Sequence, residues 1–282
     1  MYRYSKEEVR VAIPDVSSKS ITELISLKDR NAVVTGGARG IGLAICERFA
    51  EAGANVVIGD LDEKLAQEAA ERLAQQHGVN MIATLLDVTD SGSIGTVAMQ
   101  AVGALGGIDI WVNNAGIYPL NPALEISDEM WDKVLDINLR GTFIGCREAA
   151  RQMVQAGKGG VIINLASTAG YRGAAAMAHY VSSKHAVRGL TRSLAIEFGP
   201  HNIRVLALAP TVIRTPSVAE VRANLAAAGV RDPLGEGLDA RLPLGRAGVP
   251  DDVARVALFC ASDLSMLMTG STLPVDAGAV AS

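Results

Sequence analysis

The sequence contains few aromatic side chains and no cluster of lysine or arginine. Phe, Trp and Tyr make up only 4% of its 282 residues, whereas alanine is abundant. The core must therefore be built from small and aliphatic side chains packed at short distances. The formal net charge is −4. Because binding to a nucleic-acid backbone needs a basic face, we expect no nucleic-acid partner.

Cysteine and long apolar runs are also scarce. Cys46, Cys146 and Cys260 lie far apart and form no CxxC pair, which predicts buried thiols in a reducing compartment. There is no HExxH motif, so we expect no metal site. No run reaches about 18 apolar residues, and near the start of the chain the longest is Val11 to Ile13. We therefore expect a cytoplasmic protein that does not bind membranes.

From residue 31 onward, short β-branched runs alternate with longer helical patterns, as in chains built from βαβ units. Most of the predicted strands are continuously apolar, which is typical of a sheet buried on both faces. We predict one doubly wound Rossmann-type α/β domain over residues 28–282, with a seven-stranded parallel sheet and helices on both faces. The predicted strands are Asn31 to Thr35, Asn55 to Ile58, Met81 to Leu86, Ile108 to Val112, Val161 to Leu165, Arg204 to Leu208 and Thr272 to Val275.

Two segments fall outside this alternation. Residues 1–27 form an N-terminal extension, and residues 212–246 form an insert with several prolines and a short apolar helix around Val218 to Ala228. Such an insert is typical of a substrate loop, although a surface decoration is the simpler alternative. The predicted helices are Ile41 to Ala52, Glu63 to Gln76, Ser93 to Leu105, Trp131 to Gln155, Ala176 to Phe198 and Pro250 to Ala261.

A glycine-rich turn, Thr35-Gly36-Gly37-Ala38-Arg39-Gly40-Ile41-Gly42, follows the first predicted strand and opens a helix. Glycines let backbone N–H groups and the positive end of a helix approach a pyrophosphate. The candidate cofactor-binding residues here are Gly36, Arg39, Gly40, Ile41 and Gly42. The spacing is TGxxxGxG rather than GxGxxG, and such a turn taken alone can simply close a βα connection.

Asp60 lies at the end of the second predicted strand, about 20 residues after the turn. A carboxylate at this place accepts hydrogen bonds from the ribose hydroxyls and repels a 2′-phosphate, which favours NAD over NADP. Arg39 argues the other way if it pairs with a 2′-phosphate, although a solvated arginine is an equal alternative at this position. The repulsion by Asp60 is the more direct effect, and we predict NAD.

Tyr180 and Lys184 are four residues apart in a helical pattern, so both lie on one helix face. A nearby ammonium favours the phenolate and lowers the tyrosine pKa from about 10 toward the range of a general acid or base. Ser167 follows the fifth predicted strand, where its hydroxyl would hold a substrate oxygen. Asn138 is the polar exception in an apolar helix stripe, so its amide must bond a backbone group at a helix bend or anchor a water.

Together these motifs resemble the short-chain dehydrogenase/reductase family over about residues 28 to 282. The resemblance rests on the glycine-rich turn, Asp87-Val88, Asn113-Asn114-Ala115-Gly116, Asn138, Ser167 and Tyr180-x-x-x-Lys184. It implies that Tyr180 transfers the proton at the carbonyl or alcohol oxygen and that Ser167 positions this oxygen. Lys184 would hold the nicotinamide ribose and lower the tyrosine pKa, and Asn138 would fix a water beside Lys184.

The resemblance also implies further cofactor contacts and an assembly. It places Asp87 and Val88 at the adenine, Asn114, Ala115 and Gly116 at a ribose, and Ile213 and Thr215 at the carboxamide and phosphate. It implies a homotetramer in which the helices around 131–155 and 176–198 pair across an interface. Two positions depart from the family pattern, because Thr211 and Ala277 stand where glycine is common.

We predict an NAD-dependent oxidoreductase that acts on CH-OH groups and interconverts a secondary alcohol and a ketone, with Tyr180 as general acid/base. One alternative is an NADPH-dependent ketoreductase of the 3-oxoacyl-carrier type. Another is a non-catalytic dinucleotide-binding sensor. An apolar or ring-bearing small-molecule substrate is favoured by Tyr118, Tyr171 and the apolar residues of the insert, which are Val218, Val221, Leu225, Leu234 and Leu238.

Overall fold

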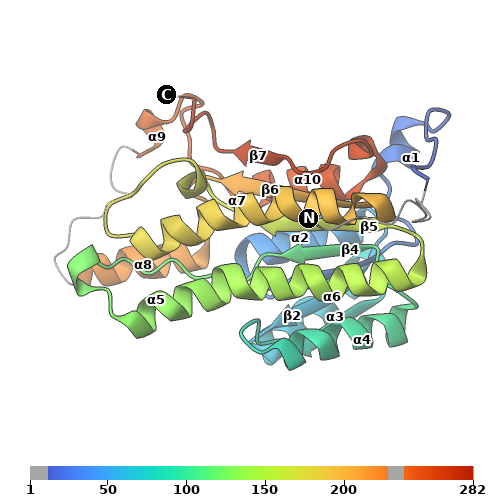
Figure 1. Cartoon of the computed structure of the whole chain (residues 1–282), viewed down its shortest axis with the longest axis horizontal. Helices are drawn as coiled ribbons and strands as arrows, with labels where there is room; N and C mark the ends of the chain where they lie inside the picture. The colour runs from blue at the N-terminus through green and yellow to red at the C-terminus, as the bar shows by residue number, and fades with distance from the viewer. Residues whose placement is uncertain (1–11, 228–237, 282) are drawn as a thin grey trace, which may run out of the picture.

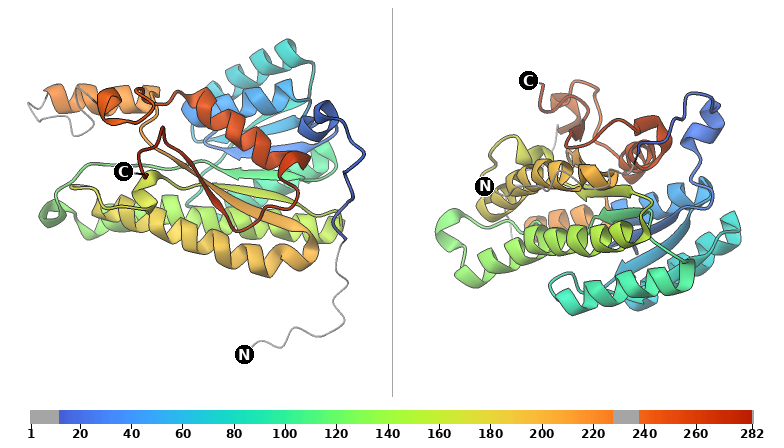
Figure 2. Two further views of the ribbon diagram at one scale, coloured as in Figure 1. Left: turned by 90° about the horizontal axis from the view of Figure 1, so that it is seen from above. Right: turned by 45° about the vertical axis from the view of Figure 1, so that its right-hand side comes forward.

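A single seven-stranded sheet forms the centre of the computed structural model, which describes residues 12–227 and 238–281 (Figures 1 and 2). The strand order is β3-β2-β1-β4-β5-β6-β7, and every pair of neighbours is parallel. The predicted doubly wound α/β architecture is confirmed. The strands are β1 Asn31–Thr35, β2 Asn55–Asp60, β3 Met81–Leu85, β4 Ile110–Asn113, β5 Gly160–Leu165, β6 Ile203–Pro210 and β7 Thr272–Val275.

Helices cover both faces of the sheet (Figure 2). One face packs against α2 Gly40–Glu51, α3 Glu63–His77 and α10 Pro250–Ala261, and the other against α4 Ser91–Leu105, α6 Gly141–Ala156 and α7 Ala178–Phe198. Successive strand residues feed the two cores in turn, so Val34 packs under the first group and Val33 under the second. Because both faces are covered, β6 is buried along its whole length.

The predicted helix 131–155 differs from the structure in its start and its continuity. It begins earlier, with α5 Asp128–Leu135, because the Ser127 hydroxyl accepts a hydrogen bond from the Met130 N–H at 3.2 Å and caps the first turn. A π-helical turn, η2 Asp136–Arg140, then separates α5 from α6. The predicted start of the next helix at Ala176 is also too early, because Ala176 has a left-handed φ of 59°.

The insert contains α8 Pro216–Ala227 and α9 Leu238–Arg241. Helix α8 matches the short helix predicted around 218–228, of which Ala228 lies outside the described residues. The side chains of Leu225, Leu234 and Leu238 lie outside the description as well.

The described part of the N-terminal extension, residues 12–27, lies beside η5 Asp263–Ser265 at the end of α10 (Figure 2). Its helix α1 Ile21–Ile25 starts with a capping box between Ser20 and Glu23. The Lys19 ammonium bonds the Asp263 carboxylate at 2.7 Å, and Leu27 is fully buried in the core beside α2. Residues 19–27 are therefore tied to the domain by one ion pair and one buried side chain.

Candidate active site

The predicted site residues gather at one edge of the sheet. They follow the carboxyl ends of β1, β2, β3, β4, β5 and β6, or lie on the helices that pack there. Since all strands are parallel, these ends lie at the same edge, and the strand order reverses between β1 and β4. Ligands of open α/β sheets bind at this edge, next to such a reversal.

The glycine-rich turn is packed too closely for side chains at two positions. Gly36 has a left-handed φ of 63°, and its N–H donates to the Gly59 carbonyl oxygen at 2.7 Å. A Cβ at Gly42 would lie 2.1 Å from the Gly36 carbonyl oxygen. The backbone segments at Gly36 and Gly42 therefore lie too close together for side chains, as is typical of a phosphate-binding turn.

Helix α2 begins directly after this turn, and its N-cap residue Arg39 makes no side-chain cap hydrogen bond. The first backbone N–H groups of a helix have no partner within the helix, so they favour an anion. Gly40 faces Thr215, since a Cβ there would lie 3.5 Å from the Thr215 Cγ2 atom, while Ile41 packs against the core. This uncapped helix end and the glycine cradle fit a dinucleotide pyrophosphate.

Asp60 lies at the rim of the turn, where two backbone N–H groups hold its carboxylate. Ala38 donates to Oδ2 at 3.0 Å and Asp62 donates to Oδ1 at 3.1 Å. Arg39 contacts Glu220 of α8 instead, at 3.8 Å, and both of these side chains are exposed. The two residues that argue for different cofactors are thus held by different partners.

Asn114 and Thr35 tie the loop after β4 to the turn. The Asn114 amide donates to the carbonyl oxygens of Thr35 at 3.0 Å and Gly36 at 2.8 Å. The Thr35 hydroxyl accepts from the N–H groups of Asn114 and Ala115, both at 3.0 Å. Next along the loop, a Cβ at Gly116 would lie 3.1 Å from the Asn138 Oδ1 atom. The loop therefore connects the predicted cofactor site to the catalytic side.

Asp87 and Val88 lie in the loop after β3. The Asp87 carboxylate accepts from the N–H and the hydroxyl of Thr89, at 2.8 and 2.7 Å, and so closes its own turn. The Val88 carbonyl oxygen would be 2.7 Å from a Cβ at Gly141, the first residue of α6. This close approach seats the loop against the start of α6.

The segment after β6 carries Ile213 and Thr215. Ile213 is buried and forms a parallel bridge with Gly248. The Thr215 hydroxyl accepts from the Val218 N–H at 3.2 Å where α8 begins. Thr211 does not have a positive φ, so the glycine that is common at this position is not required here.

Tyr180 and Lys184 lie on one face of α7. The Lys184 ammonium is 5.6 Å from the centroid of the Tyr180 ring and donates to the Leu165 carbonyl oxygen at 2.7 Å. Burial lowers the pKa of Lys184 to about 8. Burial also raises the pKa of the Tyr180 phenol, and the hydrogen bond with Ser167 opposes this rise. The net effect is a raised tyrosine pKa, opposite in direction to the predicted lowering, because burial of the phenol is the largest cause.

Ser167 follows β5 and caps the short helix η3 Thr168–Gly170. Its hydroxyl oxygen accepts from the Ala169 N–H at 3.1 Å. The hydroxyl donates to the Pro210 carbonyl oxygen at 3.5 Å, the upper limit for a hydrogen bond. The oxygen is thus well fixed, whereas its proton is weakly held.

Asn138 lies in the π turn and is fully buried. Its amide oxygen accepts from the Ile117 N–H at 2.8 Å, and its amide nitrogen donates to the Ile117 carbonyl oxygen at 2.8 Å and to the Ser183 hydroxyl at 3.2 Å. The structure thus shows the first predicted alternative, a bond to the backbone at a helix irregularity. Such π turns are frequent at functional sites.

Two residues beside Tyr180 hold its main chain and have no distinctive sequence signal. The Ser183 hydroxyl donates to the Tyr180 carbonyl oxygen at 2.7 Å. His179 is fully buried, and its Nδ1 accepts from the Tyr180 N–H at 2.8 Å. Both bonds lie within α7, so they satisfy the Tyr180 N–H and carbonyl oxygen locally.

A buried polar network lies below the site. Trp111 donates to the Asn113 side-chain oxygen at 2.7 Å, Asn113 donates to Asn164 at 2.9 Å, and Asn164 donates to Thr191 of α7 at 3.1 Å. Asn113 and Asn164 pair in register on β4 and β5. An asparagine at the end of two neighbouring predicted strands is the signal that could have identified this pair.

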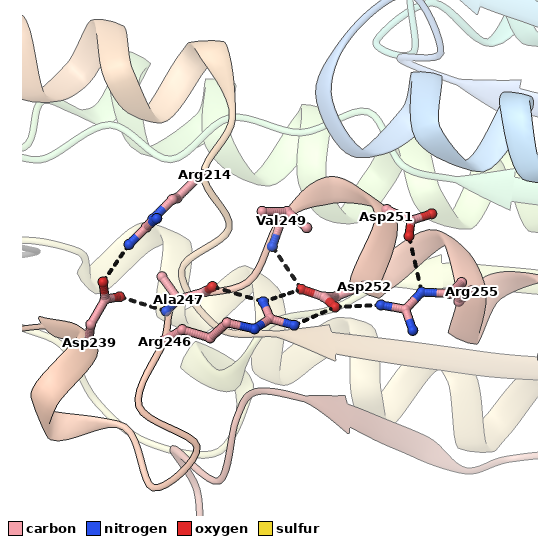
Figure 3. Close-up of polar contacts among 8 residues, drawn as sticks. All are labelled: Arg214, Asp239, Arg246, Ala247, Val249, Asp251, Asp252 and Arg255. Atoms are coloured by element: carbon pink, nitrogen blue, oxygen red, sulfur yellow. Dashed lines mark hydrogen bonds and ion pairs between the residues drawn. The ribbon is translucent and has the colours of Figure 1, made fainter.

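A group of ion pairs holds the ends of the insert, which we call the insert base (Figure 3). Its charged members are Arg214, Asp239, Arg246, Asp251, Asp252 and Arg255. Arg214 pairs with Asp239, whose other oxygen accepts from the Ala247 N–H at 2.6 Å. Arg246 bonds both oxygens of Asp252, at 2.6 and 2.8 Å. These bonds join the start and the end of the insert to α10.

All three cysteines are free and buried. Within residues 12–227 and 238–281, no cluster of three or more His, Cys, Asp or Glu side chains is arranged to bind a metal ion. In the same part of the chain, no helix combines the length and the apolar character needed to cross a membrane.

The chain is similar to known proteins over most of its length. The family model described as enoyl-(acyl carrier protein) reductase matches residues 36–280. The chain is 39% identical to 3-oxoacyl-(acyl-carrier-protein) reductase FabG of Chlamydia pneumoniae over 254 residues, 90% of this chain and 98% of that protein. It is 36% identical to NAD-dependent glycerol dehydrogenase of Listeria innocua over 260 residues, 92% of this chain and 97% of that protein.

A solved short-chain type dehydrogenase/reductase from Mycobacterium marinum has the same fold. It superposes with a TM-score of 0.85 at 35% identity, covering 93% of this chain and all of that one. The chain belongs to the short-chain dehydrogenase/reductase family, whose members are oxidoreductases that bind a nicotinamide dinucleotide.

Proposed function

We propose that this chain is an NAD-dependent oxidoreductase that interconverts a secondary alcohol and a ketone. The choice of NAD is carried by the Asp60 carboxylate, which the Ala38 N–H holds at the rim of the glycine-rich turn. A fixed anion there accepts hydrogen bonds from ribose hydroxyls and repels a 2′-phosphate. The similarity to a dehydrogenase named as NAD-dependent supports the same choice.

The proposed cofactor contacts follow the order of the loops. The pyrophosphate would lie on the end of α2, the adenosine ribose at Asp60 and the adenine at the loop after β3. The contributing residues are Gly36, Arg39, Gly40, Ile41, Gly42, Asp60, Asp87, Val88, Asn114, Ala115, Gly116, Tyr180, Lys184, Ile213 and Thr215. When bound, NAD supplies the ring carbon that accepts or returns a hydride.

Tyr180 is the proposed proton carrier. During alcohol oxidation its phenolate takes the hydroxyl proton, and during ketone reduction its phenol returns it. The Ser167 hydroxyl donates to the substrate oxygen, since its bond to Pro210 is already at the limiting length of 3.5 Å. The Lys184 ammonium, 5.6 Å from the centroid of the Tyr180 ring, would stabilise the phenolate when it forms. Asn138 holds the loop after β4 against α7, where a water beside its amide would link Lys184 to solvent.

We propose a substrate with an apolar or ring-bearing group beside the reacting carbon. The Tyr118 ring lies edge-on to Tyr180, with ring centroids 6.2 Å apart and an interplanar angle of 69°. This places a second aromatic surface next to the phenol. An aromatic wall favours a flat or apolar group over a polyol.

An NADPH-dependent ketoreductase remains the second candidate, and Arg39 is the observation that favours it. Its side chain is exposed, and its contact with Glu220 is long, at 3.8 Å, so it is available to a 2′-phosphate. The identity to a 3-oxoacyl-(acyl-carrier-protein) reductase supports the same reading.

The test compares kcat/KM with NAD and NADP for cyclic alcohols, aryl alcohols, polyols and a 3-oxoacyl thioester. We expect NAD to be preferred by at least about tenfold and the Asp60→Ser variant to lose that preference, because one carboxylate charge is removed. Arg39→Ser is the matched variant and should lower kcat/KM for NADP more than for NAD, because only NADP carries the 2′-phosphate with which this arginine would pair. Preference of the wild type for NADP would instead establish the ketoreductase.

We further propose a cytoplasmic homotetramer. Three buried free thiols suit a reducing compartment. Phe143 of α6 and Ile196 of α7 are 40% and 78% exposed, and such side chains suit an interface between copies. Light scattering of the purified protein tests the assembly, and a monomer mass would disprove it.

A further inference from the structure

Arg188 lies on the catalytic helix α7, four residues after Lys184 and eight after Tyr180. Residues at this spacing share one helix face. The Arg188 guanidinium stacks over the Tyr171 ring, with its central carbon 3.5 Å from the ring centroid. One of its N–H groups also donates to the Gly170 carbonyl oxygen. The Arg188 side chain therefore contacts the end of η3 in two ways: its planar face stacks on Tyr171, and one N–H group at its edge bonds Gly170.

The backbone of η3 determines where the Ser167 hydroxyl lies. The Ala169 N–H donates to the Ser167 Oγ atom at 3.1 Å, and the Gly170 N–H donates to the Ser167 carbonyl oxygen at 2.9 Å. The other bond of the hydroxyl, to Pro210, is long at 3.5 Å. A shift of Gly170 would therefore move the serine oxygen relative to the Tyr180 phenol, another group with which this hydroxyl forms a hydrogen bond.

Helix α7 and η3 are also in direct backbone contact. A Cβ at Gly170 would lie 2.8 Å from the Lys184 carbonyl oxygen and 2.9 Å from the Arg188 Cδ atom. On its far side, Tyr171 donates its hydroxyl to the Thr272 carbonyl oxygen of β7 at 3.2 Å. The Tyr171 ring is thus held between β7 and the arginine.

We propose that Arg188 is a positioning residue that sets the distance between Ser167 and Tyr180, an inference that rests on the proposed function. Arg188 and Tyr180 belong to one rigid helix, so fixing η3 to Arg188 fixes the serine relative to the phenol. The arrangement carries a local cost, because the buried Arg188 Nε has no hydrogen-bond partner among the residues that the structure describes. Local costs of this kind are expected at functional sites.

The test combines Arg188→Met with Ser167→Ala and the double variant. We expect Arg188→Met to lower kcat by about 10- to 100-fold, since a displacement of about 1 Å has effects of this size. The KM of the substrate and the Kd of NAD should change by less than about threefold, because the residue acts only on the positioning of the oxygen. In the Ser167→Ala background, Arg188→Met should have no further effect on kcat.

Two other variants keep the test decisive. Arg188→Lys keeps the charge but not the planar stack, so its kcat should lie between those of the wild type and Arg188→Met. If Arg188→Met does not fold, Arg188→Lys is measured in its place. Arg192→Met, one turn further along α7 and exposed, is the matched control and should behave as wild type. A kcat of Arg188→Met within twofold of wild type, or an equal loss in both serine backgrounds, would overturn the proposal.

A readout that needs no turnover separates this inference from the proposed function. Hydrogen exchange of the Ala169, Gly170 and Tyr171 amides should become faster in Arg188→Met and stay unchanged in Arg192→Met. If the wild type turns over no alcohol or ketone, the proposed function fails, but faster exchange in Arg188→Met would still show that Arg188 fixes η3. Unchanged exchange in Arg188→Met would disprove the positioning role of Arg188, whether or not the enzyme is active.

Discussion

The proposed catalytic side, around Asn138, Ser167, Tyr180 and Lys184, and the insert base both depend on polar side chains, but the first is largely buried and the arginines of the second are exposed. Asn138 and Ser183 are fully buried, and each bonds a backbone group of a neighbouring residue in the site. In the insert base, the Arg246 and Arg255 side chains are each 57% exposed and pair mainly with other charges (Figure 3). The hydrogen bonds of the buried site residues are shielded from water. The ion pairs of the insert base compete with water and dissolved salt.

This difference determines what each region contributes. A buried hydrogen bond adds only about 0.5–1.5 kcal/mol, but leaving its partner unsatisfied costs about 1–3 kcal/mol, so such a network has one strongly preferred geometry. An exposed ion pair contributes about 0–1 kcal/mol and tolerates rearrangement. We therefore expect variants of the catalytic side to have large effects that do not depend on salt, and variants of the insert base to have small effects that do.

The largest expected effect is on the chemistry itself. Tyr180→Phe removes the only atom that transfers the proton in the proposed mechanism and keeps the ring against Tyr118. We expect kcat to fall by about 100- to 10,000-fold, while NAD binding, measured by titration, stays within about threefold. Turnover above one tenth of the wild-type rate would show that another group carries the proton.

The second effect concerns Lys184, whose burial costs stability. Its pKa of about 8 is below the ordinary lysine value, so folding must desolvate a charge at every pH below 8. This cost is relieved as the pH rises from about 8 to about 10.4, where the unfolded chain still holds the proton. Relative to Lys184→Met, the wild type should therefore gain at most about 3 kcal/mol of unfolding free energy across this range.

Urea unfolding at pH 7 and pH 10 measures this change. The exposed Lys158→Met variant is the matched control and should show the same pH dependence as the wild type. A constant difference between the wild type and Lys184→Met would mean that the ammonium is not desolvated in the folded chain.

The third effect tests the buried amide at the π turn. Asn138→Ala leaves both the N–H and the carbonyl oxygen of Ile117 without the partner that they have in the structure. We expect a loss of about 2–3 kcal/mol in unfolding free energy that is equal at low and high salt. Asn80→Ala, at an exposed position, should change the stability by less than about 0.5 kcal/mol. If Asn138→Ala also lost less than about 0.5 kcal/mol of unfolding free energy, the hydrogen bonds of Asn138 to Ile117 would not stabilise the fold.

The fourth effect is the contribution of the Asp252 carboxylate in the insert base to the unfolding free energy. Arg246 and Arg255 hold the pKa of Asp252 well below its usual range, so the carboxylate stabilises the fold at neutral pH and this contribution is lost as the pH falls below about 4. Asp252→Asn should cost about 1 kcal/mol at pH 7 and almost nothing in 1 M salt. A cost that persists in salt would mean that the insert base resembles the catalytic side.

The same contrast explains which features could be predicted from the sequence. The strands and the residues at their carboxyl ends follow from apolar runs and glycine-rich turns, which are local and strongly patterned. A helix bend at Asn138 is one of the two predicted alternatives, but its π-helical form could not be predicted, because it depends on how neighbouring helices pack. The role of Arg188 was hidden for a related reason, since its partners Gly170 and Tyr171 lie in a loop after a different strand. In the insert base, the pairs of Arg255 with Asp251 and Asp252 have helical spacing, whereas the pairs of Arg214 and Arg246 have no such pattern.

The smallest expected effect tests a departure from the family pattern. Ala277 has a left-handed φ of 52°, and its carbonyl oxygen accepts from the Leu244 N–H at 3.2 Å, next to the insert base. An L-residue in this conformation costs about 1–2 kcal/mol, and glycine avoids that cost but loses about 0.5–1 kcal/mol through the greater freedom of its unfolded chain. Ala277→Gly should therefore raise the unfolding free energy by about 0.5–1 kcal/mol. Ala279→Gly, at a buried position without a positive φ, should lower it. If both variants lower the unfolding free energy, the backbone at Ala277 is not strained.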